Sequence, residues 1–369
     1  MGGGASWNKI LPDETDPQSN EPLQRVKGRG AQSQSPNRFE SVHLSVEPTE
    51  STSAKTTQYL TDQSQSIVSQ NSSPDIPFRY SINPYRGCEH GCSYCYARPT
   101  HEFLGMSAGI DFESKIIVKD NAVDLLRTFL ARPKWKPESM MMSGVTDPYQ
   151  PIERDRKITR GILRLMLQCR HPISVITKNA LIERDLDLLQ ALATDNLVHV
   201  AISITTLDRE LAQVMEPRTS SPDARFRAIK TLADAGVPVR IMAAPVIPGL
   251  NDHEIPELLS RASDAGATTA GYVMLRLPGA VQPIFEEWLS RVRPNNIEKV
   301  LAKIQEVRDG AMNDTAFRSR MRGTGVRADS IAEMFKLFAQ KKGLGLESKP
   351  LACDRFVPPA SSSGQMSLF

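Results

Sequence analysis

The feature that most constrains this chain is a short loop in which three cysteines, Cys88, Cys92 and Cys95, follow the spacing C-x3-C-x2-C. The other two of the five cysteines lie far away in the sequence. Cysteines this close cannot form a disulfide framework, and their odd number would leave one thiol over. A group of thiols this dense therefore indicates a metal centre.

Two kinds of metal centre match three neighbouring thiols. A zinc knuckle would need His90 or His101 as a fourth ligand, and neither lies at the usual zinc-finger offset. A cubane iron–sulfur cluster is held by cysteine thiolates on a tight loop and normally takes four. With three ligands one iron stays open, and such an iron can chelate a small molecule through an amine and a carboxylate. We favour the cluster and keep zinc as the alternative.

From residue 78 onward, short apolar runs alternate with amphipathic stretches, a pattern typical of βα units around a parallel sheet. The predicted strands are Tyr80–Ile82, Met140–Val145, Ile173–Thr177, Val198–Thr205, Val239–Val246 and Tyr272–Leu277. The amphipathic stretches between them are Asn121–Leu130, Lys157–Leu167, Arg184–Ala193, Asp223–Ala235 and Glu254–Ala265. These units predict an α/β fold, a partial (β/α)6 TIM-like barrel with its chemistry at the C-terminal ends of the strands. The cysteine loop follows the first strand, at that end.

The composition divides the chain into four regions. Residues 1–75 are rich in Ser, Gln, Thr and Asn and have few periodic apolar positions, which is typical of disordered chain. Two basic turns interrupt this leader, Val26–Ala31 and Asn37–Glu40. We expect them to be solvated, with packing onto the main domain or contact with a phosphate as alternatives. The regions are a mostly disordered leader (1–75), the barrel (76–280), a helical extension (281–345) and a flexible tail (346–369).

The helical extension carries a cationic segment that includes Arg318, Arg320 and Arg322. This segment could cover the open side of the barrel or form a solvated helical face. The predicted helices of the extension are Pro283–Arg291, Asn296–Arg308 and Ala328–Ala339.

Composition also narrows the compartment and the partners. The formal net charge of the 369 residues is only +3, so any nucleic-acid surface must be local. Five cysteines in a chain of this length argue for a reducing compartment. No apolar run reaches the roughly 18 residues of a membrane span, and the N-terminal segment lacks the apolar core of a secretory signal. We therefore expect a cytoplasmic protein without a membrane segment.

The cysteine loop, C-x3-C-x-aromatic-C, resembles the signature of the radical S-adenosylmethionine (radical SAM) enzymes. The resemblance implies a [4Fe-4S] cluster bound by Cys88, Cys92 and Cys95, whose open iron binds the amino and carboxylate groups of S-adenosyl-L-methionine. It further implies a low-potential electron donor, flavodoxin- or ferredoxin-like. One electron then cleaves the sulfonium and gives a 5′-deoxyadenosyl radical, which abstracts hydrogen.

The resemblance also implies positions for the cofactor-binding residues. Ser143, after the second predicted strand, is expected at the amino group of the cofactor, and Lys178, after the third, at its carboxylate. Ser203 lies on the same strand face as Thr205 and would face the cofactor. Tyr94, between the second and third cysteines, is expected beside the adenine. For Lys178, a solvated side chain is the alternative.

Four further groups at predicted strand ends have open roles. Asp147 and Gln150 are candidate supporting groups, although turn chemistry alone explains an Asp-Pro sequence. Glu216-Pro217-Arg218 could hold a salt bridge or touch the ribose. Arg276, at the end of the sixth strand, could meet a substrate phosphate or a core carboxylate.

The order of these motifs is similar to one branch of the superfamily, the spore photoproduct lyase-like (DNA repair photolyase-like) group, and within it to an uncharacterised subgroup. The resemblance implies action on a nucleic-acid base, most plausibly a DNA lesion. Modification of RNA, a peptide or a small molecule, or a non-catalytic iron–sulfur protein that binds partners, are the alternatives. The motifs are Asn83–Cys88, Thr146–Pro151, Ile176–Lys178, Glu216–Arg218 and Pro248–Asp252.

The chain departs from that group at the hydrogen donor. The lyase uses a cysteine next to the serine after the second strand, and here that neighbour is Met142. Methionine cannot donate this hydrogen, so Tyr96 and Tyr149 are the candidate catalytic replacements.

The C-terminus carries a separate motif. Its last five residues, with Gln365, Leu368 and Phe369, resemble the Q-x-x-L-F peptide by which bacterial proteins bind the DNA sliding clamp. Such a peptide can insert its two hydrophobic residues into a preformed pocket. The clamp and DNA are therefore candidate partners.

Overall fold

The computed structural model describes residues 26–39 and 56–360. Within this part of the chain, the main sheet has the strand order β10-β9-β8-β7-β6-β3-β2, and all neighbouring pairs are parallel except β2 with β3. Since β10 and β3 do not pair, this sheet is open, as the prediction of a partial (β/α)6 barrel requires. The strands are β2 (Val68–Gln70), β3 (Tyr80–Ile82), β6 (Met140–Met142), β7 (Ile173–Thr177), β8 (Val198–Ser203), β9 (Val239–Val246) and β10 (Thr269–Met274).

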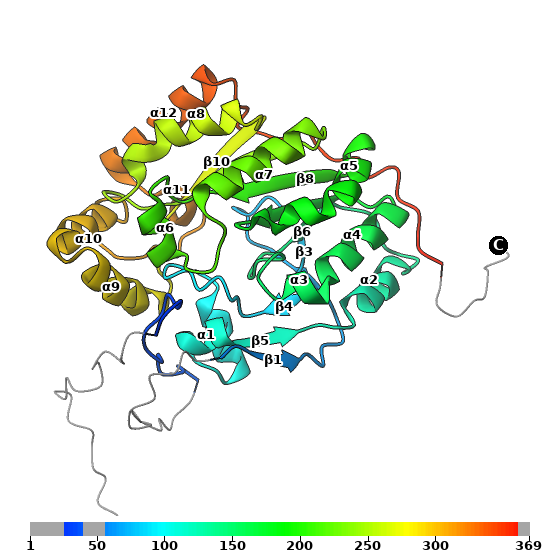
Figure 1. Ribbon diagram of the computed structural model, residues 1–369, viewed down its shortest axis with the longest axis horizontal. Coiled ribbons are helices and arrows are strands. Elements are labelled where there is room, and N and C mark those ends of the chain that lie inside the picture. Colours follow the sequence, from blue (N-terminus) through cyan, green and yellow to red (C-terminus); the bar gives the residue numbers. More distant parts are fainter. Residues whose placement is uncertain (1–25, 40–55, 361–369) are drawn as a thin grey trace, which may run out of the picture.

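Helices pack on the outside of this sheet (Figure 1). Helix α7 shows why they form where the sequence predicts. Ser221 caps its N-terminus by accepting a hydrogen bond from the Ala224 N–H, and Pro222 occupies the first helical position. Gly236 follows its end with a left-handed φ of 76°. The helices between strands are α2 (Ala122–Leu130), α3 (Glu153–Arg156), α4 (Ile158–Gln168), α5 (Leu186–Thr194), α6 (Arg209–Met215), α7 (Pro222–Asp234) and α8 (Ile255–Asp264).

The strand register lines up the apolar core and the polar strand ends. Val175 of β7 pairs with Val200 of β8, which pairs with Val239 of β9, and all three are buried. The same register sets Ser203, the last residue of β8, beside β9. Because the strands are parallel and start together, their C-terminal ends form one edge, which we call the mouth. Strand β10 begins at Thr269, earlier than predicted. The prediction missed Thr269, Ala270 and Gly271 because these three residues form no apolar run.

A second, smaller sheet supports the cysteine loop. It consists of β1 (Gln58–Thr61), β5 (Lys115–Val118) and β4 (Tyr85–Arg86), in the order β1-β5-β4. Helix α1 (Ile110–Ser114) leads into β5, and the Cys88 N–H donates to the Phe112 carbonyl of α1 at 2.9 Å. Strands β1 and β2 lie in the region predicted to be a mostly disordered leader, so that prediction is wrong for both.

Residues 26–38 also differ from the prediction of a solvated basic turn. The N–H groups of Gly30 and Ala31 donate to the Glu113 carboxylate at 3.0 and 2.8 Å. A side chain at Gly30 would place its Cβ 1.8 Å from the Gly91 carbonyl oxygen, so this backbone lies directly against the cysteine loop. Of the alternatives, packing onto the main domain is the one observed. We call residues 26–38 the clamp segment.

The C-terminal extension closes the gap between β10 and β3. Arg320 of α11 pairs with Asp75, which precedes β3, at 2.6 Å. Arg322 donates to the Tyr272 carbonyl of β10 at 3.2 Å. The cationic segment therefore bridges the open side of the barrel, which is one of the two alternatives that the sequence left open. The extension consists of α9 (Val281–Val292), α10 (Ile297–Glu306), α11 (Ser319–Arg322) and α12 (Gly325–Lys341).

The chain after α12 runs down the outside of the barrel (Figure 1). The Ala352 N–H donates to the Asn196 carbonyl and the Val357 N–H to the Cys169 carbonyl. The Phe356 ring packs edge-on against His171 at 5.3 Å. The prediction of a flexible tail is therefore wrong for residues 350–357, and the Gln365–Phe369 peptide lies outside the described residues. None of the helices described is both long and apolar enough to cross a membrane.

Candidate active site

The cysteine loop forms a tight, buried turn at the mouth. Cys88 and Cys92 are each 7% exposed, and Cys95 is partly buried. The Gly91 N–H donates to the Cys88 carbonyl at 3.3 Å and the Cys95 N–H to the Cys92 carbonyl at 3.2 Å. Gly91 has a left-handed φ of 64°, and a Cβ there would lie 2.6 Å from Glu113 Oε2. The turn therefore needs glycine at this position.

The thiols are placed where isolated thiolates would be costly. Burial, and then the charges of Asp147 and the other two thiols, raise the pKa of Cys88 well above its usual range. Burial, and then Glu216, raise the pKa of Cys92. Crowded thiolates in such a place need a compensating cation, and a bound metal centre deprotonates its thiol ligands.

Backbone groups favour the thiolate form at two of these sulfurs. Burial is the largest effect and raises the pKa of both Cys88 and Cys95, and the nearby backbone N–H groups of His90 and Ala97 oppose it by favouring the thiolates. Hydrogen bonds to cysteine sulfur are a recognised means of tuning iron–sulfur clusters. The donor set of this loop therefore fits such a cluster.

The side chains of the loop are not grouped around a single ion in this structure. Among the described residues, no three His, Cys, Asp or Glu side chains are grouped to hold a single metal ion. Zinc thiolates converge within about 2.3 Å of one ion, whereas a four-iron cluster holds its thiolates farther apart. The candidate fourth ligands have other partners. His90 Nδ1 lies 3.4 Å from Asp147 Oδ2, and His101 Nε2 lies 3.1 Å from the Lys115 carbonyl oxygen.

Three of the predicted cofactor-binding residues meet at the ends of β7 and β8. Lys178 Nζ donates to Ser203 Oγ at 2.8 Å and to Thr205 Oγ1 at 3.1 Å, and it lies 3.2 Å from Glu216 Oε1. Tyr94 donates its hydroxyl to the same carboxylate. Tyr94, Lys178 and Ser203 are thus brought together, and Lys178 is not simply solvated.

Glu216 is the centre of this network. Arg225 Nη2 donates to Glu216 Oε2 at 2.5 Å, and both side chains are buried. Burial alone would raise the pKa of Glu216, but Arg225 and Lys178 outweigh it and hold that pKa well below its usual range. Glu216 therefore forms the salt bridge expected of the Glu216-Pro217-Arg218 motif with Arg225 and Lys178, which lie outside the motif. Arg218 instead donates to the Gly28 carbonyl at 3.2 Å. The sequence carried no local signal for Arg225.

Ser143 lies at the end of β6 in a strained conformation. Its φ is 78°, a left-handed value that non-glycine residues rarely adopt and that clusters at functional sites. The Asn83 side chain holds the turn by accepting hydrogen bonds from the Gly144 and Val145 N–H groups at 3.0 and 3.1 Å. The Ser143 hydroxyl donates to the Thr146 carbonyl. Ser143 thus lies at the mouth, but no direct contact joins it to Lys178.

Asp147 and Gln150 link the strand ends to the cysteine loop. Asp147 Oδ2 accepts the Lys178 N–H at 2.8 Å, and its Oδ1 accepts the Thr177 hydroxyl at 2.7 Å. Gln150 Oε1 accepts the Glu89 N–H at 2.9 Å. Both therefore act as supporting groups, and Asp147 does more than form a turn.

The two candidate hydrogen donors lie in different places. Tyr149 is 0% exposed and belongs to the apolar core, with the Arg184 guanidinium 5.8 Å from its ring. Tyr96 is 48% exposed, and its hydroxyl donates to the Gly144 carbonyl. The Arg276 guanidinium lies over the Tyr96 ring, 5.3 Å from its centre. The structure therefore brings Tyr96 to the mouth and leaves Tyr149 in the core.

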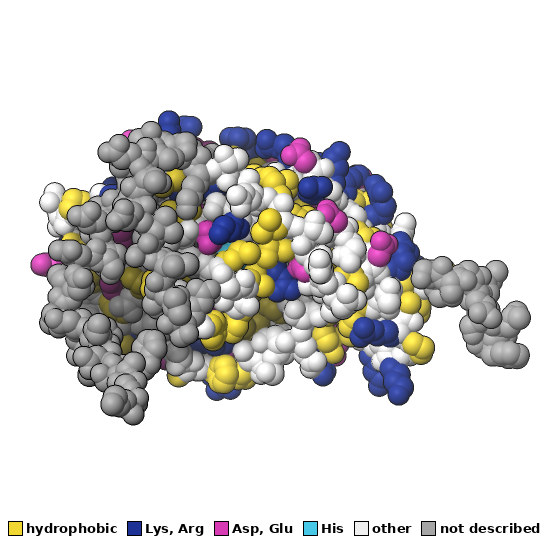
Figure 2. All heavy atoms as spheres, turned by 90° about the horizontal axis from the view of Figure 1, so that it is seen from below, with side chains coloured by type: hydrophobic (Ala, Val, Ile, Leu, Met, Phe, Trp, Pro, Cys, Tyr) yellow, Lys and Arg dark blue, Asp and Glu magenta, His cyan; other side chains and the backbone are white. Residues whose placement is uncertain are grey.

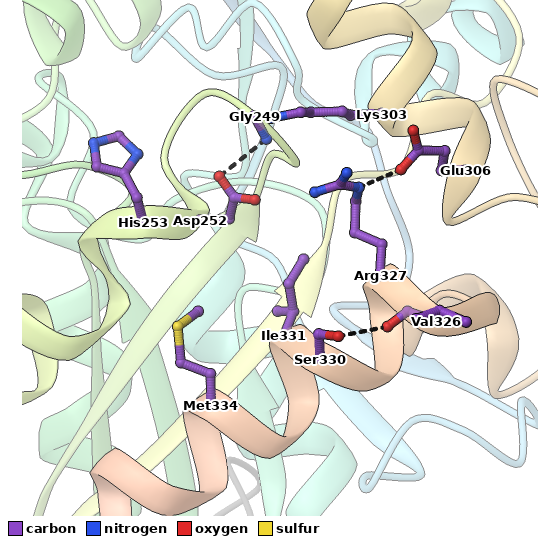
Figure 3. A pocket seen from close by; sticks show the side chains of 10 residues that line it. All are labelled: Gly249, Asp252, His253, Lys303, Glu306, Val326, Arg327, Ser330, Ile331 and Met334. Atoms are coloured by element: carbon purple, nitrogen blue, oxygen red, sulfur yellow. Dashed lines mark hydrogen bonds and ion pairs between the residues drawn. The ribbon is translucent and has the colours of Figure 1, made fainter.

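A cavity of about 600 Å³ lies apart from these residues. It is formed by the loop after β9 together with α10 and α12 (Figure 3). Two of its charged side chains pair with each other, since Arg327 donates to Glu306, and Asp252 accepts the Gly249 N–H at 3.0 Å. No residue that lines it contributes a thiol or belongs to the Lys178–Glu216 network, so we place the site at the mouth.

The part of the chain that carries these residues is similar to known proteins. Residues 82–262 match the model of the radical SAM superfamily. An uncharacterised protein of Mycobacterium tuberculosis is 38% identical over 226 residues, which are 61% of this chain and 66% of the relative. One of Methanocaldococcus jannaschii is 34% identical over 176 residues, which are 48% of this chain and 63% of the relative. The chain thus spans slightly less than two thirds of either relative.

Solved structures give the same fold. Spore photoproduct lyase in complex with dinucleoside spore photoproduct superposes with a TM-score of 0.57 at 15% identity, covering 78% of this chain and 81% of that one. A double mutant of the lyase with bound AdoMet and dinucleoside spore photoproduct gives a TM-score of 0.54, covering 78% and 80%. At this identity the similarity concerns the fold alone.

Proposed function

Residues 82–262 place this chain in the radical SAM superfamily, and on that premise we propose that it is a radical SAM enzyme acting on a nucleic-acid base. Cys88, Cys92 and Cys95 would hold one [4Fe-4S] cluster. When bound, the cluster supplies the electron that cleaves S-adenosylmethionine to a 5′-deoxyadenosyl radical. The observation that carries the proposal is the buried three-thiol loop beside the Tyr94, Lys178 and Ser203 network.

The residues around Lys178 are suited to bind the amino-acid part of the cofactor. Lys178 already uses its three N–H donors on Ser203, Thr205 and the Ala244 carbonyl, next to Glu216. A cofactor carboxylate would therefore replace one of these acceptors rather than meet a free ammonium group. This exchange keeps the buried charges paired in both states.

A nucleic-acid base is the substrate class that the mouth supports best. The exposed ring of Tyr96 lies beside the last cysteine and can stack on a base that is flipped out or single-stranded. A solved protein of this fold, spore photoproduct lyase, is complexed with a dinucleoside spore photoproduct. A low-potential electron donor would be needed as a partner.

The hydrogen donor must differ from a thiol at the end of β6. Met142 there is fully buried. Cys169 ends α4 and leads into the start of β7, away from the mouth, and Cys353 lies in the C-terminal segment. Tyr96 is the remaining candidate, since its hydroxyl is at the mouth.

Anaerobic reconstitution followed by chromatography of 5′-deoxyadenosine tests this proposal. The protein should cleave S-adenosylmethionine under a low-potential reductant, and product analysis should show turnover of ultraviolet-damaged DNA above undamaged DNA and RNA. Turnover of RNA alone would contradict the DNA part. Binding of the C-terminal peptide to the DNA sliding clamp is a separate proposal. Unchanged binding to the sliding clamp after deletion of Leu368 and Phe369 would refute it.

A further inference from the structure

Arg276, at the end of β10, has no carboxylate partner among the residues that the structure describes. Its side chain is partly buried, and its Nε is fully buried without a hydrogen-bond acceptor there. The contacts of its guanidinium are the Tyr96 ring at 5.3 Å and Met321 Sδ at 3.9 Å. Of the two partners that the sequence left open for Arg276, a core carboxylate is therefore not the one found.

The surroundings of Arg276 add positive charge. Burial, and then the nearby Arg320, lower the pKa of Arg276, and the smaller effects of Tyr96 and Asp75 oppose them. Asp75 is already engaged, because Arg320 donates to both of its carboxylate oxygens at 2.6 and 2.7 Å. A second arginine, Arg308, is buried and donates to the carbonyls of Leu275 and Ser319 rather than to an acid. A buried guanidinium is stable only when an anion or hydrogen bonds satisfy it, so this place favours an anionic ligand.

Two exposed aromatic rings flank these arginines. Phe317 is 55% exposed and lies under the Arg320 guanidinium at 4.8 Å, as Tyr96 lies under Arg276. The contacts run without a break from Phe317 through Arg320, Met321 and Arg276 to Tyr96. We call these five residues the β10 rim. Alternation of rings and guanidinium groups is the arrangement by which proteins hold single-stranded nucleic acid, with bases on the rings and phosphates on the cations.

We propose that the β10 rim binds single-stranded nucleic acid, with Arg276 on a backbone phosphate and Tyr96 and Phe317 stacked on bases. This inference rests on the proposed function and names the part of the mouth that holds its substrate. An acidic peptide would also supply anions, but it would leave the exposed rings without a partner. On the described part of the face seen in Figure 2, Lys and Arg side chains lie near hydrophobic ones, with Asp and Glu among them. The formal net charge of the chain is only +3, so binding should be local rather than spread over a basic surface.

The test measures fluorescence anisotropy of a labelled 12-residue oligothymidylate with the full-length reconstituted protein and S-adenosylmethionine. Arg276→Met should weaken binding about 10- to 100-fold, as loss of charged hydrogen bonds does, and should reduce the salt slope by about 0.7. Arg276→Lys should weaken binding but keep the slope, because lysine retains the charge without the fork. The matched control is Arg227→Met, which removes an exposed arginine from the outer face of α7 and should change neither value.

A second variant keeps the test valid if substitution of Arg276 causes misfolding. Phe317 is exposed, so Phe317→Ala should fold normally and still lose about tenfold in affinity. Equal affinities for the Arg276→Met, Phe317→Ala and Arg227→Met proteins would overturn the inference. So would competition by polyglutamate as effective as by unlabelled oligothymidylate, or a wild type that does not bind.

The outcome separates this inference from the proposed function. A wild type that binds oligothymidylate through Arg276 but forms no 5′-deoxyadenosine would contradict the radical SAM function and leave the rim in place. A wild type that forms 5′-deoxyadenosine but binds oligothymidylate independently of Arg276 would contradict the rim alone.

Discussion

The two halves of the mouth are built differently. On the β7–β9 half, Lys178, Glu216 and Arg225 are surrounded by partners, and nearly every polar atom is satisfied within the protein. On the β10 half, Tyr96 and Phe317 are exposed, and Arg276 has no described acid partner. A satisfied buried network is rigid and suits a ligand whose chemistry never changes, whereas exposed rings and an unneutralised cation adapt to a substrate. We therefore propose that the cofactor and the substrate bind in separate halves.

The sharpest way to separate the two halves is to remove the metal centre. Cys92→Ala deletes one of three thiols on the loop, so the reconstituted protein should lose its iron and form no detectable 5′-deoxyadenosine. Oligothymidylate binding should persist, because the β10 rim contains none of the cysteines. Iron assay and anisotropy check both parts. The control is Cys353→Ala, which removes a thiol from the C-terminal segment and should behave as wild type. Retention of full iron by the Cys92→Ala protein would contradict the assignment of Cys92 as a ligand.

The buried network of the β7–β9 half should be the more fragile when broken. Glu216→Gln leaves Arg225 and Lys178 without their anion, and removal of one partner from a buried ion pair costs about 3–5 kcal/mol. Urea denaturation would measure the free energy of unfolding. Glu210 is an exposed carboxylate on α6, so Glu210→Gln should change that free energy by less than about 0.5 kcal/mol. Equal values for the two variants would show that the network contributes little.

Substitution in the clamp segment, residues 26–38, offers a way to disturb the cysteine loop from outside the barrel. Gly30→Ala would place a methyl group 1.8 Å from the Gly91 carbonyl oxygen, so either the clamp segment or the cysteine loop must move. The cluster should then decay faster in air, which visible absorbance follows with time. At Gly345 a Cβ would meet no atom closer than 3.4 Å, which makes Gly345→Ala the control. Identical decay in both variants would mean that the clamp segment does not protect the loop.

The smallest effect is expected at the ion pair between Asp75 and Arg320, which positions the β10 half. The pKa of Asp75 is lowered from 3.8 to about 2, chiefly by hydrogen bonding to Arg320. A lowered folded pKa means that this bridge stabilises α11 fully above about pH 4 and loses that contribution as the pH falls toward 2. The protection factors of the amides of residues 318–322, which correct for the intrinsic pH dependence of exchange, should fall over this range in the wild type and be low at all pH values in Asp75→Asn. Protection factors that do not change with pH in the wild type would contradict the assignment.

The predictable parts of this molecule are those set by local pattern. Strands and helices of the barrel follow the spacing of apolar residues, and the rule that sites gather at strand ends located Lys178 and Ser203. The clamp segment was missed because its partner Glu113 lies 83 residues from Gly30, and its polar composition gave no apolar periodicity. Tyr149 was misplaced because sequence does not tell which side of a turn faces the mouth.

We expect a radical generated at the cysteine loop, beside Lys178 and Glu216, to react with nucleic acid held on the β10 half. The direct measurement is mass spectrometry of 5′-deoxyadenosine formed in the presence of an ultraviolet-irradiated oligothymidylate that carries deuterium on its bases and sugars. We predict that deuterium enters the 5′-deoxyadenosine and that the Arg276→Met protein transfers much less. Formation of 5′-deoxyadenosine by the wild type with no deuterium would contradict the claim.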